Sequence, residues 1–78
     1  MDFNLKTILL YMQKVNVSIS DLSKRIGISR TLLYSYRNGM NLKRDKEIGI
    51  INKIKEVYPN EYDRLINYIN IDNVVRDT

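Results

Sequence analysis

Apolar residues recur along this chain at helical spacing, and no segment shows the period-two alternation typical of a strand. The first apolar stripe consists of Leu5, Ile8, Leu9 and Met12. It predicts a helix over about residues 4–14, with Asn4 or Asp2 as its N-cap. Residues 15–17 are β-branched or turn-forming, so we expect the helix to end there.

Two short helices are expected next, joined by a tight turn at Gly27. Ser18 can cap the first of them by accepting a hydrogen bond from the backbone N–H three residues later. Gly27 follows the last apolar residue of this helix, where a helix end favours a left-handed residue. Ser29 can cap the second helix, and Asn38-Gly39 is a signal that ends it.

The two short helices share one apolar face, formed by Leu22, Ile26, Ile28, Leu33 and Tyr36. Ser23 is a small residue at the position where the helices would cross. Helices that meet at about 90–120° need a left-handed turn residue and a small side chain at their contact. We therefore expect the apolar set to point into one core and the opposite face of the second helix to stay free.

Two longer helices complete the predicted all-α fold. Asp45 can cap the fourth helix, for which we expect core positions at Ile48, Ile51, Ile54 and Tyr58. Pro59-Asn60 ends this helix, and Asn60 can cap a fifth. The apolar stripe of the fifth helix consists of Tyr62, Leu65, Ile66 and Ile69. We expect one domain over residues 1–70 and a tail over residues 71–78 that either frays or takes part in a dimer contact.

Composition and charge narrow the class of function. The 78 residues include neither cysteine nor histidine, which removes thiolate nucleophiles, the commonest metal ligand and the commonest general base. From Lys24 to Lys46, seven cationic residues are accompanied by one acidic residue, Asp45. This segment therefore has a net charge of +6, and the rest of the chain has −2, which gives +4 for the whole chain. Such a segment indicates a polyanion bound at one face, although a solvated basic surface has the same composition. We expect no enzymatic activity, no cofactor and no metal.

The motif Leu22-Ser23-Lys24-Arg25-Ile26-Gly27-Ile28-Ser29, followed by Asn38-Gly39, is the most specific pattern in the chain. It resembles the phage-repressor-like (Cro/repressor, XRE) helix-turn-helix family, and with the flanking helices the resemblance covers about residues 5–58. The resemblance implies a five-helix lambda-repressor-like domain whose second and third helices form the helix-turn-helix. It implies the function of a sequence-specific, double-stranded DNA-binding transcriptional regulator, a repressor of phage or plasmid type.

The chain departs from the family pattern at three positions. Ile19 stands where the family often has a glutamine that braces a phosphate and the recognition helix, so this brace is absent or comes from elsewhere. Ser23 replaces the usual alanine and is still small. Arg37 replaces a frequent glutamate near the end of the recognition helix, which adds positive charge there.

The resemblance places the helix at about residues 30–38 in the major groove of DNA. The implied base-contacting residues are Ser29, Arg30, Thr31, Tyr34 and Ser35. Arg30 is the strongest candidate because its guanidinium matches the O6/N7 edge of guanine, although it could instead bind a phosphate or face solvent. Tyr34 could contact a thymine methyl, a sugar or a phosphate, or lie partly buried against Met40. The implied phosphate-contacting residues are Ser18, Ser20, Lys24, Arg37, Asn38, Asn41, Lys43 and Arg44.

Members of the family usually bind as dimers to operators with two-fold symmetry. Candidates for a homodimer contact through the C-terminal helix are Tyr62, Ile66, Tyr68, Ile69, Ile71 and Val74, which could equally complete the core of a monomer. A second class of function is a protein-interaction module, antirepressor-like, in which the same scaffold binds another regulator. No stretch approaches the ~20 apolar residues of a membrane span, so we expect a cytoplasmic protein with no membrane partner.

Overall fold

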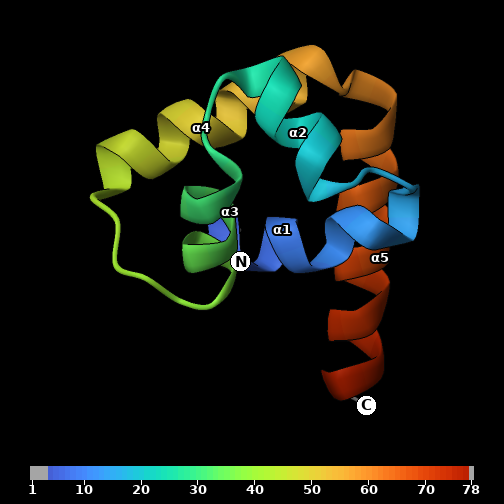
Figure 1. The fold of residues 1–78 in the computed structure, drawn as a ribbon. Coiled ribbons are helices and arrows are strands. Elements are labelled where there is room, and N and C mark those ends of the chain that lie inside the picture. The colour runs from blue at the N-terminus through green and yellow to red at the C-terminus, as the bar shows by residue number, and fades with distance from the viewer. Residues whose placement is uncertain (1–3, 78) are drawn as a thin grey trace.

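Residues 4–77 form five α-helices and one short 3-10 helix in a computed structural model of the protein (Figure 1). The structure describes the backbone of residues 4–77 and the side chains of residues 4–71. The elements are α1 (Leu5–Tyr11), η1 (Met12–Val15), α2 (Ile19–Ile26), α3 (Arg30–Arg37), α4 (Arg44–Val57) and α5 (Pro59–Asp77). No strand occurs within residues 4–77, so the prediction of an all-α fold is confirmed.

Local hydrogen bonds determine where the first three α-helices begin. The side-chain oxygen of Asn4 accepts a hydrogen bond from the backbone N–H three residues later, at 2.8 Å. Ser18 and Ser29 do the same at the starts of α2 and α3, at 3.1 and 3.2 Å. The caps at Ser18 and Ser29 were predicted from the sequence, and Asn4 is one of the two residues proposed for the first cap. Each satisfies a backbone donor that a helix start otherwise leaves without a partner.

The first helix ends earlier than the sequence predicted. The helix α1 ends at Tyr11, and the chain continues as the tighter 3-10 helix η1 as far as Val15. Asn16 then adopts a left-handed conformation, with φ 61°, and its N–H donates to the carbonyl of Gln13 at 3.2 Å. Met12 and Val15 are both buried, so the tighter winding keeps two apolar residues on the core side.

The apolar core is built around α1, which lies between α3 and α5 (Figure 1) and also contacts α4. α2 packs against α3 and α4. The most deeply buried side chains are Leu5, Ile8, Leu9, Met12, Leu22, Leu33, Ile54 and Leu65. Every element from α1 to α5 contributes at least one of them, so a single core unites all the helices.

The prediction for α4 was wrong in its helical phase at the start. Ile54 and Tyr58 are buried as expected, but Ile48 is 41% exposed and Ile50 is buried in its place. Ile48 lies about 200° around the helix from Ile50, so the two cannot face the same core. Asp45 is not the cap either, because the helix begins at Arg44 and no side chain caps it.

The last helix begins earlier and runs further than the sequence predicted. Pro59 is its first residue, a position that suits proline because its missing N–H would have no partner there. Leu65 and Ile69 bury the inner stripe against the core. The backbone stays helical to Asp77, where we expected a tail from residue 71, and the final turns extend past the other helices (Figure 1).

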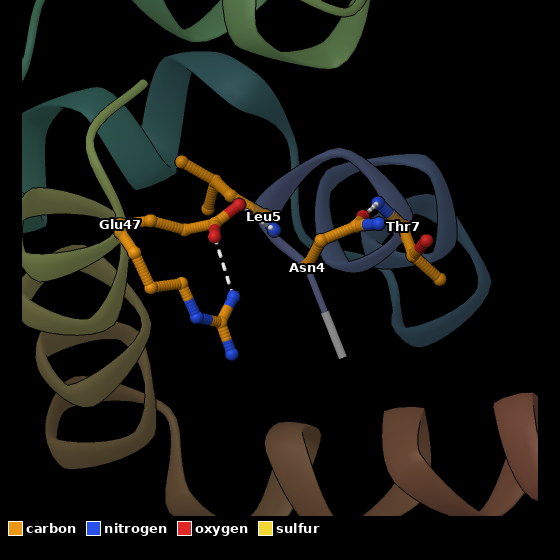
Figure 2. Close-up of polar contacts among 5 residues, drawn as sticks. Asn4, Leu5, Thr7 and Glu47 are labelled. Carbon is orange, nitrogen blue, oxygen red and sulfur yellow. Dashed lines mark hydrogen bonds and ion pairs between the residues drawn. The ribbon is translucent and has the colours of Figure 1, made fainter. Parts of the chain in front are cut away.

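A carboxylate of α4 holds the start of α1. The side chain of Glu47 points toward the first turn of α1 (Figure 2), and its Oε2 accepts a hydrogen bond from the backbone N–H of Leu5 at 3.0 Å. Its Oε1 accepts from the guanidinium of Arg44. The N–H of Leu5, aided by Arg44 and opposed by burial, lowers the pKa of the Glu47 carboxyl. The bond between Leu5 and Glu47 connects α1 to α4 across 42 positions of the sequence.

We predict that Glu47 makes the stability of the protein sensitive to acid. A carboxyl whose pKa is lower in the folded state stabilises the fold above its ordinary pKa of 4.5, and this stabilisation is lost as the pH falls through the folded pKa. Glu47→Gln should lower the free energy of unfolding at pH 7 by about 1–2 kcal/mol. It should also flatten the decline in stability below about pH 5. Urea denaturation at a series of pH values measures both effects.

Glu56→Gln is the matched control, because Glu56 is an exposed glutamate on the same helix. This variant should keep the acid-dependent decline of the wild type. A Glu47→Gln protein that loses as much stability in acid as the wild type would contradict the role given to Glu47.

Tyr58 places a hydroxyl in the core without a partner. Its side chain is only 6% exposed, and its Oη has no hydrogen-bond partner among the described residues. Burial raises the pKa of the Tyr58 hydroxyl, although the nearby Arg25 partly offsets this effect. The Arg25 guanidinium lies 5.2 Å from the centre of the ring. Tyr58 therefore stabilises the fold through its ring and not through its hydroxyl.

We predict that Tyr58→Phe is neutral or stabilises the protein by up to about 1 kcal/mol, because a buried hydroxyl without a partner loses its hydration and gains nothing in return. Tyr58→Ala should destabilise it by about 3–5 kcal/mol through loss of the buried ring. Chemical denaturation at pH 7 compares the two variants. A loss above about 1 kcal/mol in Tyr58→Phe would show that the hydroxyl is hydrogen-bonded in solution.

Candidate nucleic-acid interface

α2 and α3 are connected by a turn whose shape depends on Gly27. This residue has φ +74°, in the left-handed region, and its N–H donates to the carbonyl of Ser23 at 3.0 Å. A Cβ at Gly27 would meet nothing within 4 Å, so the backbone angle and not lack of space favours glycine. The Ser23 hydroxyl donates to the carbonyl of Ile28 at 2.6 Å. This bond ties α2 to the segment that enters α3, and it gives a reason for serine at the crossing.

α3 has one packed face and one open face. Leu33 and Tyr36 are buried, as the sequence predicted, and the helix contacts α1 and α2. Neither α4 nor α5 packs against it within the described part of the chain. Arg30 and Thr31 are exposed on the open side. The open face of α3 is therefore available to a partner along the full length of the helix.

The N-terminus of α3 is linked to the first turn of α2. Nη1 of Arg30 donates to Oγ of Ser20 at 3.3 Å, which is a long and easily exchanged hydrogen bond. The neighbouring Ile19 is buried in the core and makes no such contact. Ser20, the next residue, therefore supplies the side-chain hydrogen bond between α2 and Arg30 of α3.

Two further contacts organise the open face of α3. The guanidinium of Arg37 lies 4.8 Å from the centre of the Tyr34 ring, close enough for a cation–π interaction. Tyr34 is 42% exposed, so the side chain remains partly accessible beside Arg37. The Ser35 hydroxyl donates to the carbonyl of Thr31 at 3.0 Å, which keeps this side chain close to the helix. On this face the small Ser35 side chain stays close to the helix, whereas the larger Tyr34 side chain is exposed.

An open hollow of ≈ 320 Å³ lies between α2 and the start of α3. Its lining consists of Ser20, Ser23, Lys24 and Arg30. The Ser20 hydroxyl and two cations, without a carboxylate, make this hollow suitable for an anionic group such as a phosphate, whereas the Ser23 hydroxyl already donates its proton to Ile28. Arg25 is directed elsewhere, because its guanidinium lies over the ring of Tyr58. Only part of the basic segment therefore gathers beside α3.

The loop after α3 carries the other predicted phosphate contacts. Asn38, Asn41 and Lys43 are exposed, whereas Arg44 is paired with Glu47. The loop starts from a closed helix end, since the N–H groups of Gly39 and Met40 donate to carbonyls of the last turn of α3 at 3.1 and 2.9 Å. Gly39 has φ +102°, which again favours glycine.

A cation that sequence reasoning missed lies beside this loop. The Nζ of Lys6 is 3.8 Å from the position that a Cβ on Gly39 would occupy. Lys6 belongs to α1 and precedes the basic segment by 18 residues. No signal in the local sequence connects the two positions, and only the packing of α1 against α3 brings them together.

The residues predicted for a dimer contact separate into two groups. Ile69 is only 3% exposed, and Tyr62 packs against the core, so these two belong to the core of one protomer. Ile66 is half-buried, whereas Tyr68 and Ile71 are exposed, the latter by 59%. The side chain of Val74 lies outside the described residues. The prediction that Tyr62 and Ile69 take part in a dimer contact was therefore wrong for Ile69, which is enclosed in the core, and Tyr62 is largely used in the same packing.

Within the part of the chain that the structure describes, no three potential metal-ligating side chains form a group. No helix there has the length and apolar character needed to cross a membrane. Comparison with family models, curated proteins and solved structures found no match to this chain.

Proposed function

We propose that this protein is a sequence-specific, double-stranded DNA-binding transcriptional regulator that acts as a repressor. In this proposal the fold is a lambda-repressor-like domain, and α2 and α3 form its helix-turn-helix. The observation that carries the proposal is the open polar face of α3, held by a left-handed turn and flanked by cations. A helix presented in this way, with its N-terminus exposed, is the arrangement that reads the major groove.

The dimensions and chemistry of α3 suit this role. Its eight residues span about 12 Å, which is comparable to the width of the major groove. Arg30 is the first residue of the helix and can exchange its long bond to Ser20 for the O6/N7 edge of a guanine. Thr31 offers a methyl group for thymine, and the exposed part of Tyr34 can pack on a thymine methyl or a sugar. Ser29 and Ser35 are small enough to allow close approach.

Phosphate contacts would position α3 in the groove and supply most of the affinity. Ser18 and Ser20 lie at the start of α2, where backbone N–H groups favour anions, and Ser20 also lines the hollow with Lys24. Beyond α3, the exposed polar and cationic residues of the loop would follow the sugar-phosphate backbone. Arg44 would take part through the N–H groups that it does not use in its bond to Glu47.

Binding-site selection from random duplex DNA tests the proposal directly. We predict a two-fold symmetric consensus with at least one base preference that is relaxed in Arg30→Ala. On the selected site, Arg30→Ala should weaken binding by about 1–3 kcal/mol.

Lys43→Ala should instead weaken binding to selected and random DNA alike and reduce the log–log salt slope by about one. Fluorescence anisotropy at several salt concentrations measures these effects.

Two results would contradict the assignment. If Arg30→Ala keeps both the affinity and the base preference of the wild type, α3 is not the reading helix. If the wild type binds no duplex DNA, or binds it without dependence on salt, the antirepressor-like alternative, a module that binds another regulator, becomes the better account.

We further propose that the protein binds its operator as a symmetric homodimer through the end of α5. Tyr68 and Ile71 are exposed on this helix, and its final turns extend past the other helices (Figure 1), where a second copy could pack against them. Half-sites of such operators lie about 34 Å apart, and the two copies of α3 in the dimer would have to match this spacing. The dimer surface would then be centred on Tyr68 and Ile71, which lie about 60° apart around the helix, whereas the half-buried Ile66 lies about 200° from Tyr68.

We predict a species of twice the 9.3 kDa monomer mass in analytical ultracentrifugation at micromolar concentration. Ile71→Asp should convert it to monomer, because a charge cannot be buried in an apolar contact without a partner. Asn60→Asp, which adds the same charge at the opposite end of α5, should leave the dimer intact. A wild type that sediments only as a monomer, with and without operator DNA, would contradict the dimer.

A further inference from the structure

Lys6 brings a positive charge to the C-terminal end of α3 from a distant part of the sequence. Its side chain is exposed, and its ammonium group lies beside Gly39, at the point where the chain leaves the helix. Lys6 and Gly39 line the same hollow of ≈ 230 Å³, together with Met40 and Asn41. The ammonium therefore lies next to the loop that carries Asn41 and Lys43.

The contacts around Lys6 do not account for a charge at this place. Glu47 lines the same hollow, but its two carboxylate oxygens accept from the Leu5 N–H and from Arg44. No carboxylate of the described residues forms an ion pair with Lys6. The last turn of α3 does not depend on Lys6 for a cap either, because backbone N–H groups of the loop already bind two of its carbonyls. The ammonium group thus remains directed to solvent beside the end of α3.

We infer that the DNA-contacting surface extends onto α1, and that Lys6 binds a phosphate of the duplex. This inference rests on the proposed function of α3. The hollow lined by Lys24 and Arg30 lies at the N-terminal end of α3, and Lys6 lies at its C-terminal end. The helix between them is about 12 Å long, close to the width of the major groove. Lys24 beside the N-terminal end of α3 and Lys6 beside its C-terminal end can therefore reach phosphates on the two strands that border the groove.

Charge-matched variants test this inference on the full chain. We predict that Lys6→Gln weakens binding about three- to tenfold, equally for selected and random duplexes, and reduces the log–log salt slope by about 0.9. Lys6→Arg, which keeps the charge, should restore the slope. Lys53→Gln, which removes a lysine from the exposed side of α4, should leave the slope unchanged. Thermal denaturation followed by circular dichroism establishes that each variant is folded at the temperature of the assay.

The outcomes separate this inference from the function on which it rests. If the wild type binds DNA and Lys6→Gln keeps its salt slope, Lys6 is not a phosphate contact, whereas α3 can still be the reading helix. If Lys53→Gln reduces the slope as much as Lys6→Gln, the effect is one of net charge and the inference is wrong. If the wild type shows no binding to duplex DNA, the proposed function fails and this inference fails with it.

Discussion

The left-handed turn between α2 and α3 is the constraint on which the candidate interface depends. Gly27 can adopt a positive φ without the penalty that a side chain would bring, and the Ser23–Ile28 hydrogen bond fixes the segment that follows. The direction of α3 is set by these two features and by the burial of Leu33 and Tyr36. Because the inner face of α3 is fully used in this packing, its polar face is directed outward.

The rest of the fold supports α3 from behind through α1. This helix is only seven residues long, too short to be stable alone, and it is held by packing on three helices and by polar contacts at its start. Asn4 supplies a local cap, and Glu47 supplies a second acceptor from α4. The carboxylate thus links the helix at the centre of the core to the helix that follows the candidate DNA-contacting loop.

The cations of the chain are divided by the fold according to what they contact. Lys24 and Arg30 share an open hollow, whereas Arg25 covers the buried ring of Tyr58 and Arg44 pairs with Glu47. Lys6 joins the group near α3 although it lies outside the basic segment of the sequence. The cations that surround α3 are therefore not the same residues as the basic segment of the sequence. Binding to a polyanion would depend on the cations around α3.

The sequence alone determined the features that depend on neighbouring residues: the all-α class, the caps at Ser18 and Ser29, and the left-handed Gly27, and it narrowed the first cap to Asn4 or Asp2. Such features could be predicted because a cap or a turn involves residues only a few positions apart. The buried face of α4 could not be predicted in this way, because its closely spaced isoleucines allow more than one apolar stripe. Only packing against the neighbouring helices selects Ile50 over Ile48. Tertiary packing alone likewise decided that Glu47 reaches Leu5, that Lys6 lies beside Gly39 and that Ile69 is enclosed within the protomer. In each case the partners are far apart in sequence, and no local preference of the chain encodes their distance.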